Sequence, residues 1–297
     1  LREYEFIKDS PACKIALPQD DYDCCRILDD WMINWKIDRI YSVCSNDLEV
    51  LYPKSIKNLD IRLGYTGYID NSWLDSWIEP KPHSCRQIDV SYRASKLPAN
   101  FGRLGQLKWK IAERFSSAIS NHKYKLDISI NPEDQISGIA WHNFLENSKF
   151  CLSTPSGSSL VDYYGEIRKC VEKLERVQND LTFEEIESRC FPNQDSVYVF
   201  NALSPRNIEA ALAETVQIAT PGICPNIMEP SKHYIELKED CSNVDEVISV
   251  INDLPLISQI RKDCKEAILS VKRLRRNNFV NEILEYAQNT VSNRQID

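Results

Sequence analysis

Short apolar runs alternate with amphipathic segments over the first 80 residues. The apolar runs have the length of buried strands, and the segments between them repeat apolar side chains at helical spacing. The predicted strands are 13–18, 37–43 and 61–64, and the predicted helices are 20–32 and 46–52. This alternation is typical of a parallel sheet with crossover helices.

The alternation stops between residues 69 and 86, where the segment 79–83 contains two prolines and breaks any regular element. A second series of strands and helices begins at Ile88. Its predicted strands are 88–92, 126–130, 150–152 and 216–219, and its predicted helices are 104–119, 141–145, 163–178, 204–213 and the stretch from Val244 onward. In the last stretch, apolar side chains share one side of the helix at Ile257, Ile260, Cys264, Ile268 and Val271. The segment 154–159 is predicted to be a turn-forming loop.

We therefore predict an α/β fold with two Rossmann-like domains, whose parallel sheets face each other across a cleft. Residues 1–83 form the N-terminal domain, 84–270 the C-terminal domain and 271–297 a helical tail. The N-terminal part is shorter than the roughly 100 residues usual for a domain. We expect it to be incomplete or reduced, so the chain either has a small first domain or is a piece of a longer protein with further domains.

Composition and charge narrow the class of protein. With 42% hydrophobic and 27% charged residues among 297, the chain can bury a core and is not disordered. Its 36 Lys and Arg against 44 Asp and Glu give a net charge of -8, which argues against general affinity for nucleic acid or an anionic membrane. No apolar run reaches the roughly 20 residues of a transmembrane helix. We expect a cytoplasmic protein in which any anionic ligand is held by a local cluster of cations.

The eleven cysteines are scattered, odd in number and never spaced as C-x-x-C. This usage predicts buried or free thiols in a reducing compartment. None of the four histidines has a zinc-ligand spacing with a cysteine, so no metal site is predicted.

Four cations gather around the turn that follows the strand 88–92: Arg93, Lys96, Arg103 and Lys108. A strand-to-helix turn also presents free backbone N–H groups, and the two together suit a diphosphate. The alternative is a solvated loop whose cations keep the surface soluble.

A second candidate is the helix 204–213, in which Glu209 is flanked by apolar or small residues. A carboxylate there could accept hydrogen bonds from the two hydroxyls of a ribose. Arg206 lies on the same helix face, and a plain Arg206–Glu209 ion pair is the alternative. The hydroxyls of Ser156 and Ser158 could line a polar pocket, although such loops are also common connectors.

The order of these segments resembles the nucleotide-sugar domain of GT-B glycosyltransferases, in particular the spore-protein and family-one-like group. The segments that carry the resemblance follow the basic loop and are Ser156-Gly157-Ser158-Ser159, the S-P-R-N-I-E-A-A-L-A run from Ser204, the P-S-K-H-Y-I-E-L run from Pro230 and Asp245-Glu246-Val247-Ile248. The resemblance covers about 88–274, with a weaker match over 13–70.

The resemblance implies a hexosyltransferase-like enzyme, for example of polysaccharide biosynthesis. It would move a sugar from a nucleotide-diphosphate donor to a glycan, lipid-linked or protein acceptor, with no metal and no cofactor. Its implied donor-binding residues are Glu209 for the ribose, Arg206 on the same helix, Arg93 with Lys96 or Lys108 for the diphosphate, the H-Y pair His233 and Tyr234, and Ser156 and Ser158 in the serine loop. At Asn201 the chain departs from the acid that many retaining members carry eight positions before the ribose acid.

No residue identifies itself as the catalytic base. Asp20, Asp70 and His83 are the candidates, because each could face the cleft from the first part of the chain. Two other functions stay open: a non-catalytic sugar-nucleotide-binding module of a larger assembly, and a two-Rossmann enzyme such as a sugar-nucleotide epimerase.

Overall fold

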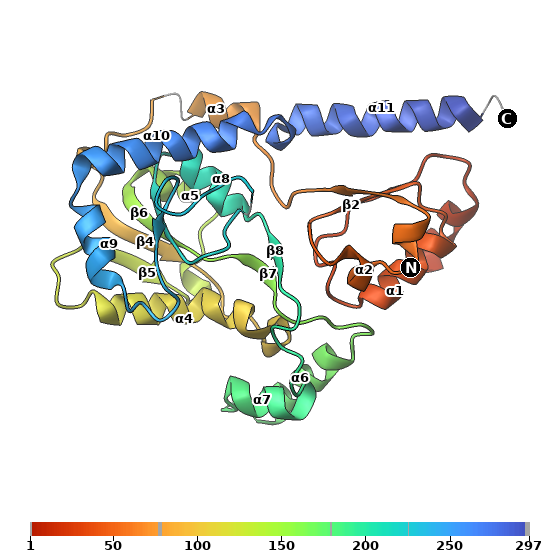
Figure 1. Cartoon of the computed structure of the whole chain (residues 1–297), viewed down its shortest axis with the longest axis horizontal. Helices are drawn as coiled ribbons and strands as arrows, with labels where there is room; N and C mark the ends of the chain where they lie inside the picture. The colour runs from red at the N-terminus through yellow and green to blue at the C-terminus, as the bar shows by residue number, and fades with distance from the viewer. Residues whose placement is uncertain (1, 77–78, 179, 225, 295–297) are drawn as a thin grey trace.

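The chain folds into two α/β lobes, each built around a parallel sheet (Figure 1). This computed structural model describes residues 2–76, 79–178, 180–224 and 226–294. The predicted α/β class with two parallel sheets is confirmed.

The N-terminal lobe has a three-stranded parallel sheet in the order β1-β2-β3. Its elements are β1 (Ile15–Ala16), α1 (Cys25–Asn34), β2 (Arg39–Ser42), α2 (Leu48–Leu51) and β3 (Asp60–Leu63), with 3-10 turns at η1 (Arg2–Asp9) and η2 (Ser55–Lys57). Met32, Ile40 and Tyr52 are almost completely buried between the helices and the sheet. The predicted order of strands and helices in this region is confirmed.

The C-terminal lobe has a five-stranded parallel sheet in the order β5-β4-β6-β9-β10. The strands are β4 (Ile88–Arg93), β5 (Leu126–Ser129), β6 (Ser148–Ser153), β9 (Val216–Ala219) and β10 (Ile235–Glu236). The strand order reverses between β4 and β6, because the chain moves outward to β5 first and then returns to the other side of β4. In doubly wound sheets ligands bind at such a switch point, beyond the carboxyl ends of the strands.

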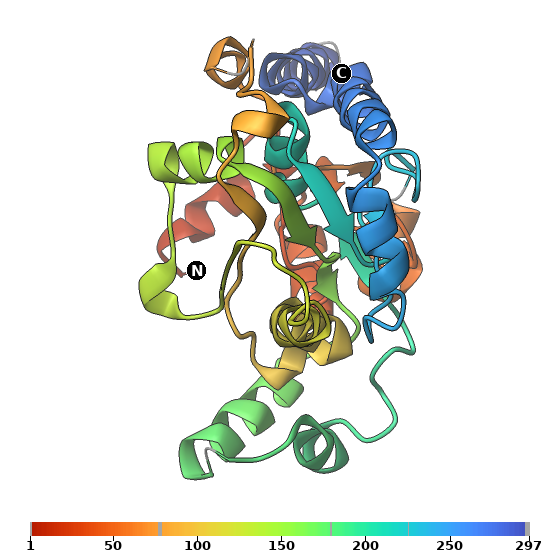
Figure 2. The ribbon, with the colours of Figure 1, turned by 90° about the vertical axis from the view of Figure 1, so that its left-hand side faces the viewer.

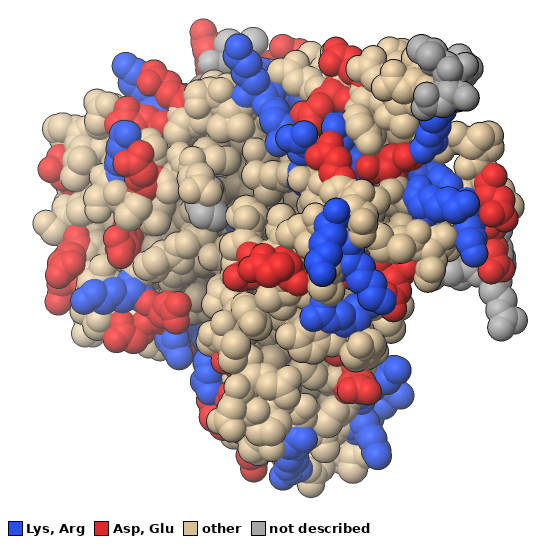
Figure 3. Space-filling view, turned by 45° about the vertical axis from the view of Figure 1, so that its right-hand side comes forward, with Lys and Arg blue, Asp and Glu red and all other residues tan. Residues whose placement is uncertain are grey.

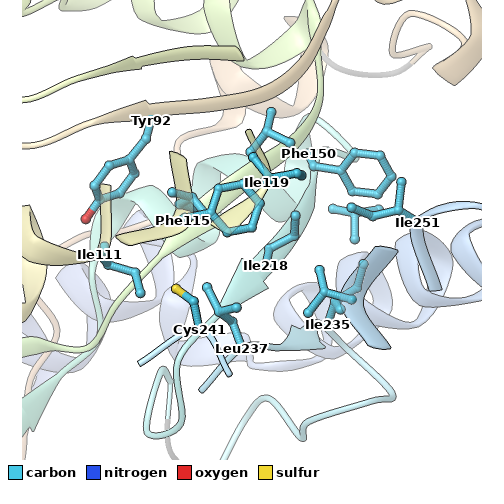
Figure 4. Close-up of a cluster of buried hydrophobic side chains, with 14 of the residues drawn as sticks. Tyr92, Ile111, Phe115, Ile119, Phe150, Ile218, Ile235, Leu237, Cys241 and Ile251 are labelled. Carbon is cyan, nitrogen blue, oxygen red and sulfur yellow. The ribbon is translucent and has the colours of Figure 1, made fainter. Parts of the chain in front are cut away.

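Helices cover both faces of the C-terminal sheet (Figure 2). They are α4 (Gly102–Ala118), α5 (Gly138–Glu146), α8 (Pro205–Leu212), α9 (Val244–Ile251) and α10 (Leu254–Ser270), with 3-10 turns at η3 (His83–Cys85), η4 (Ala99–Phe101) and η5 (Pro132–Asp134). On one face, α4 and α9 enclose an apolar cluster in which Phe115 and Phe150 are fully buried (Figure 4). On the other face, α5, α8 and the later part of α10 enclose a second cluster. Burial of each such aromatic ring stabilises the lobe by about 1.5–3 kcal/mol.

A separate segment, residues 156–202, projects from the C-terminal lobe between β6 and β9 (Figure 1). It contains β7 (Ser156–Ser158), α6 (Glu166–Val177), α7 (Phe183–Cys190) and β8 (Phe200–Ala202), with β7 antiparallel to β8. Two predictions are wrong here. The serine segment is a strand for three residues rather than a loop throughout, and Cys170 forms a disulfide with Cys190, while the other nine cysteines are free as predicted.

Gly157 is required by the close approach of β7 to β8. Its φ is +121°, and a Cβ at this position would lie 1.9 Å from the backbone oxygen of Phe200. Gly157→Ala is therefore expected to lower the free energy of unfolding by about 1–3 kcal/mol more than Gly138→Ala does. Gly138 is the matched control, because it also has a positive φ, +59°, but a Cβ there meets no atom within 4 Å. Denaturant titration measures both variants, and equal losses would contradict the clash.

The end of the chain returns to the N-terminal lobe. After η6 (Lys272–Leu274), helix α11 (Arg276–Arg294) runs along the N-terminal sheet (Figure 1). The Phe279 ring meets the Tyr41 ring edge-on at 5.0 Å, and the Tyr286 hydroxyl donates to the Asp38 carbonyl at 3.1 Å. The predicted tail 271–297 is thus mainly a helix that holds the two lobes together, and its last three residues lie outside the described part.

The two passages of the chain between the lobes lie side by side. Ile69 donates its N–H to the Leu274 carbonyl at 2.6 Å and accepts from the Arg276 N–H at 3.0 Å. The following helix α3 (Asn71–Ser76) already packs against the C-terminal lobe through Trp73 and Leu74. The chain therefore crosses from one lobe to the other before residue 71.

Candidate functional site

A cavity of about 210 Å³ lies at the switch point of the C-terminal sheet, beyond the carboxyl ends of β4 and β6. It is closed on its other sides by α4 and by the start of α8. The lining residues are Ala94, Ser95, Leu97, Lys108, Ser153, Thr154, Ser156, Ser204, Arg206 and Asn207. Three of the predicted donor-binding residues, Lys108, Ser156 and Arg206, thus share one cavity.

Two cations in this cavity have no counterion. Lys108 donates to the Ser156 hydroxyl at 3.3 Å, and the Arg206 guanidinium lies 5.1 Å from the Tyr92 ring centroid. Neither has a carboxylate within 4.0 Å among the described residues. Burial lowers the pKa of Lys108, and the nearby positive charge of Arg206 lowers it further. Two like charges held together beside a polar cavity form an electrostatically favourable site for an anion.

Buried hydrogen bonds fix the start of α8 at the cavity. Pro205 occupies the first helical position, where its missing N–H leaves no acceptor unsatisfied. Two residues later, the buried Asn207 side chain donates to Gln217 Oε1 of β9 at 2.6 Å, and the Ser153 hydroxyl donates to the same oxygen at 3.0 Å. This network ties α8 to β6 and β9, so the N-terminus of the helix is held in place beside the cavity.

Glu209 lies one turn beyond Arg206 and does not line the cavity. Its Oε2 accepts from the indole N–H of Trp141 at 2.7 Å, and the same indole ring lies 5.7 Å from the Arg206 guanidinium. The Arg206–Glu209 ion pair, which was the alternative interpretation, is not formed. Arg206, Trp141 and Glu209 therefore make a continuous polar and aromatic surface that leads away from the cavity. Trp141 was not among the predicted site residues, because nothing in its sequence neighbourhood shows that α5 packs on α8.

Arg93 and Lys96 do not line the cavity. Arg93 forms an ion pair with Asp127 of β5 at 2.7 Å and donates to the carbonyl oxygens of Tyr92, Asp127 and Asp134. Lys96 lies 4.8 Å from the ring centroid of Trp109, in a separate groove between α4 and the α6–α7 segment. The structure thus divides the predicted basic cluster and leaves Lys108 at the cavity.

The remaining predicted residues support the surrounding chain. The Ser158 hydroxyl accepts the Leu160 N–H at 3.0 Å, and His233 Nδ1 accepts the Glu229 N–H at 2.8 Å. Burial lowers the pKa of His233. Tyr234 is buried in the apolar cluster under α8 and α10, and burial raises its pKa to about 12. None of these three predicted residues lines the cavity.

Of the three candidate bases, none lines the cavity, and Asp20 is the one whose charge acts on Lys108. Asp20, an exposed residue between β1 and α1, lies close enough to Lys108 for its charge to raise the Lys108 pKa, against the larger effect of burial. Its Oδ1 accepts the Tyr22 hydroxyl at 2.7 Å. Asp70 pairs with Arg276 where the chain crosses between lobes, and His83 lies at the amino end of β4.

The N-terminal lobe also touches the start of α8 directly. The Thr66 hydroxyl donates to the Leu203 carbonyl, and Gly67 packs so closely on Pro205 that a Cβ would lie 2.9 Å from the proline ring. Residues from both lobes thus border the region around the cavity.

On the face shown in Figure 3, the described residues form no large area of a single charge. Lys and Arg are interspersed with Asp and Glu over the face shown in Figure 3. Within the described residues, no three His, Cys, Asp or Glu side chains are grouped so that they could hold a metal ion. Over the same residues, no helix has the length and apolar content needed to cross a membrane.

Comparisons with known proteins bear on the fold. No family model matches the chain, and no curated protein sequence matches it. The crystal structure of a glycosyltransferase from Rickettsia africae superposes with a TM-score of 0.50 at 12% identity, over 90% of this chain and 68% of that one. The chain has the GT-B fold.

Two further solved structures show lower similarity. TarM has a TM-score of 0.44 at 12% identity, over 86% of this chain and 44% of that one. AviGT4, a glycosyltransferase involved in avilamycin A biosynthesis, has a TM-score of 0.43 at 9% identity, over 91% of this chain and 78% of that one. The chain therefore spans less than half the length of TarM.

Proposed function

We propose that this GT-B chain is a glycosyltransferase that moves a hexosyl unit from a nucleotide-diphosphate sugar to a glycan, lipid-linked or protein acceptor. The observation that carries the proposal is the pair of cations at the switch point of the C-terminal sheet, Lys108 and Arg206, which have no carboxylate partner among the described residues. Ligands of such sheets bind there, and a diphosphate is the anionic part of the proposed donor.

The cavity of about 210 Å³ is smaller than the roughly 300 Å³ at which drug-sized ligand pockets begin. It suits the diphosphate alone. Lys108 and Arg206 would neutralise its charge, and the hydroxyls of Ser95, Thr154 and Ser156 would donate to its oxygens. In this scheme the leaving diphosphate needs no metal ion, and the chain needs no cofactor.

The nucleoside would extend along the surface made by Arg206, Trp141 and Glu209. The Trp141 N–H holds Oε2 of Glu209, and Oε1 would accept a hydrogen bond from a ribose hydroxyl. The contact by Trp141 thus supports the ribose role expected for Glu209. Arg93 has no such role in this proposal, since Asp127 and three carbonyl groups already satisfy its guanidinium.

Asp20 would act as the base from the opposite lobe. In the transfer step the acceptor oxygen bonds to the anomeric carbon, the bond from that carbon to the diphosphate breaks, and the acceptor proton passes to Asp20. The negative charge then gathers on the diphosphate, where Lys108 and Arg206 stabilise it.

Isothermal titration against UDP-, GDP-, ADP- and CDP-sugars tests the proposal. We expect one nucleotide class to bind, and we expect incubation with an acceptor to release the corresponding nucleoside diphosphate. Binding without transfer or hydrolysis would instead favour the non-catalytic module, and epimerised donor without acceptor would favour the epimerase. Folded protein that binds none of the four classes would contradict all three functions.

A further inference from the structure

A second cavity, of about 520 Å³, lies at the amino ends of β4 and β6, so it is at the opposite end of the sheet from the Lys108 cavity. Three parts of the chain enclose it: η3, the starts of β4 and β6, and the junction of α9 with α10. The lining residues are His83, Ser84, Asp89, Tyr124, Lys149, Phe150, Ile251, Asn252, Leu254, Ile257, Ser258 and Arg261. The proposed transfer reaction uses none of them.

One side of this cavity is basic. His83, Lys149 and Arg261 reach it from η3, β6 and α10. Asp89, the only carboxylate among the described lining residues, pairs with Lys149 at 2.7 Å, and Arg261 pairs with Glu214, which does not line the cavity, at 2.5 Å. His83 Nδ1 and Arg261 Nε are buried and have no hydrogen-bond partner among the described residues. A buried polar atom without a partner is costly, and both atoms belong to residues that line this cavity.

The electrostatic potential around the His83 side chain is positive. Burial is the largest cause that lowers its pKa, to about 4, and the charges of Arg261, Arg86 and Lys149 lower it further, while Asp89 acts in the opposite direction. Three cations therefore act on one imidazole, which is neutral at pH 7 and keeps an N–H to donate.

The other side of the cavity is apolar. Phe150, Ile251 and Ile257 are buried and form its floor, and the His83 ring meets the Phe150 ring edge-on at 5.3 Å. Leu254 stands at the rim with 63% of its surface exposed. An apolar floor with a few polar groups on one side is the usual composition of a small-molecule site, and 520 Å³ falls within the usual size range of about 300–1,000 Å³.

We infer that this cavity binds a small organic anion in which a phosphate or carboxylate group is joined to a flat apolar ring. The acidic group would lie between His83, Lys149 and Arg261, and the ring would lie on the apolar floor beneath Leu254. This is a second ligand site of the C-terminal lobe, and it does not depend on the proposed transfer reaction.

Binding of 1-naphthyl phosphate and of 1-naphthoate to the full chain tests the inference and distinguishes the two acidic groups. The imidazole signals of His83, observed by NMR, report on the site itself. We expect at least one of the two compounds to shift these signals and to raise the His83 pKa, because a bound anion stabilises the imidazolium. We expect 2-naphthol, which has no acidic group, and inorganic phosphate, which has no ring, to bind at least tenfold more weakly.

Two variants probe the two sides of the site. Lys149→Met and Leu254→Asn should each weaken binding about tenfold, whereas Lys262→Met should leave it unchanged. Lys262 is the matched control, because it lies on α10 beside Arg261 but has 69% of its side chain exposed and does not line the cavity. Failure of both compounds to shift the His83 signals, or equal binding by all three variants, would overturn the inference.

Discussion

Asp20→Asn is expected to reduce the turnover number by about 10²- to 10⁴-fold, which is the usual contribution of a positioned general base. Asparagine has nearly the same shape as aspartate but cannot take the acceptor proton. The affinity for the donor should not fall. It should stay equal or rise slightly, because the variant removes a negative charge near the diphosphate site at Lys108.

A fall in the turnover number without a fall in donor affinity is the result expected of a catalytic base and not of a donor-binding residue. Initial-rate kinetics with varied donor give the turnover number, and isothermal titration gives the donor dissociation constant. Asp9→Asn is the matched control, since Asp9 is an exposed carboxylate of the same lobe that lines a different cavity beside Arg294. Unchanged turnover in Asp20→Asn, or a loss of the same size in Asp9→Asn, would remove Asp20 from the mechanism.

The sheet elements could be predicted because their signals are local. The apolar run 216–219 has the bounds of β9, and four of the five side chains expected to share one side of the last helix are buried: Ile257, Ile260, Cys264 and Ile268. The fifth, Val271, follows the end of α10. The spacing of apolar residues along a segment indicates which side chains are buried. It therefore predicts such helices and strands without knowledge of the rest of the fold.

The features that the sequence did not predict depend on residues that are far apart in the sequence. β7 forms because Gly157 pairs with Asn201, more than 40 residues later, and the disulfide joins two cysteines 20 residues apart on separate helices. Neither has a local pattern. Arg93 was expected at the diphosphate because it follows β4 directly, but the neighbouring strand β5 supplies Asp127 as its partner. Lys108, which lies on α4, has no such partner within the described residues and stays at the cavity.

Lys108→Met is expected to weaken donor binding by about 10- to 150-fold. A hydrogen bond to a charged group contributes about 1.5–3 kcal/mol, and each 1.4 kcal/mol is about tenfold in affinity. Methionine keeps the length and apolar stem of lysine, so the substitution removes mainly the charge. Arg206→Met should have an effect of similar size, because the same diphosphate would contact both cations.

Lys110→Met is the matched control on the same helix. Its ammonium group lies 5.5 Å from the Trp109 ring centroid, in the groove between α4 and the α6–α7 segment, so donor affinity should not change. Lys108→Arg should recover part of the affinity, because it restores the charge. Equal dissociation constants for Lys108→Met and Lys110→Met would exclude Lys108 from the donor site.

The pH dependence of donor binding gives an independent measure of the same contact. Burial and Arg206 place the Lys108 pKa below the usual lysine value, so the free protein loses this charge at a lower pH than an exposed lysine does. A bound diphosphate favours the charged form and raises that pKa. Affinity should therefore be full below the pKa of the free protein and fall as the pH rises through it. In Lys108→Met this alkaline loss should disappear, whereas Lys110→Met should retain it.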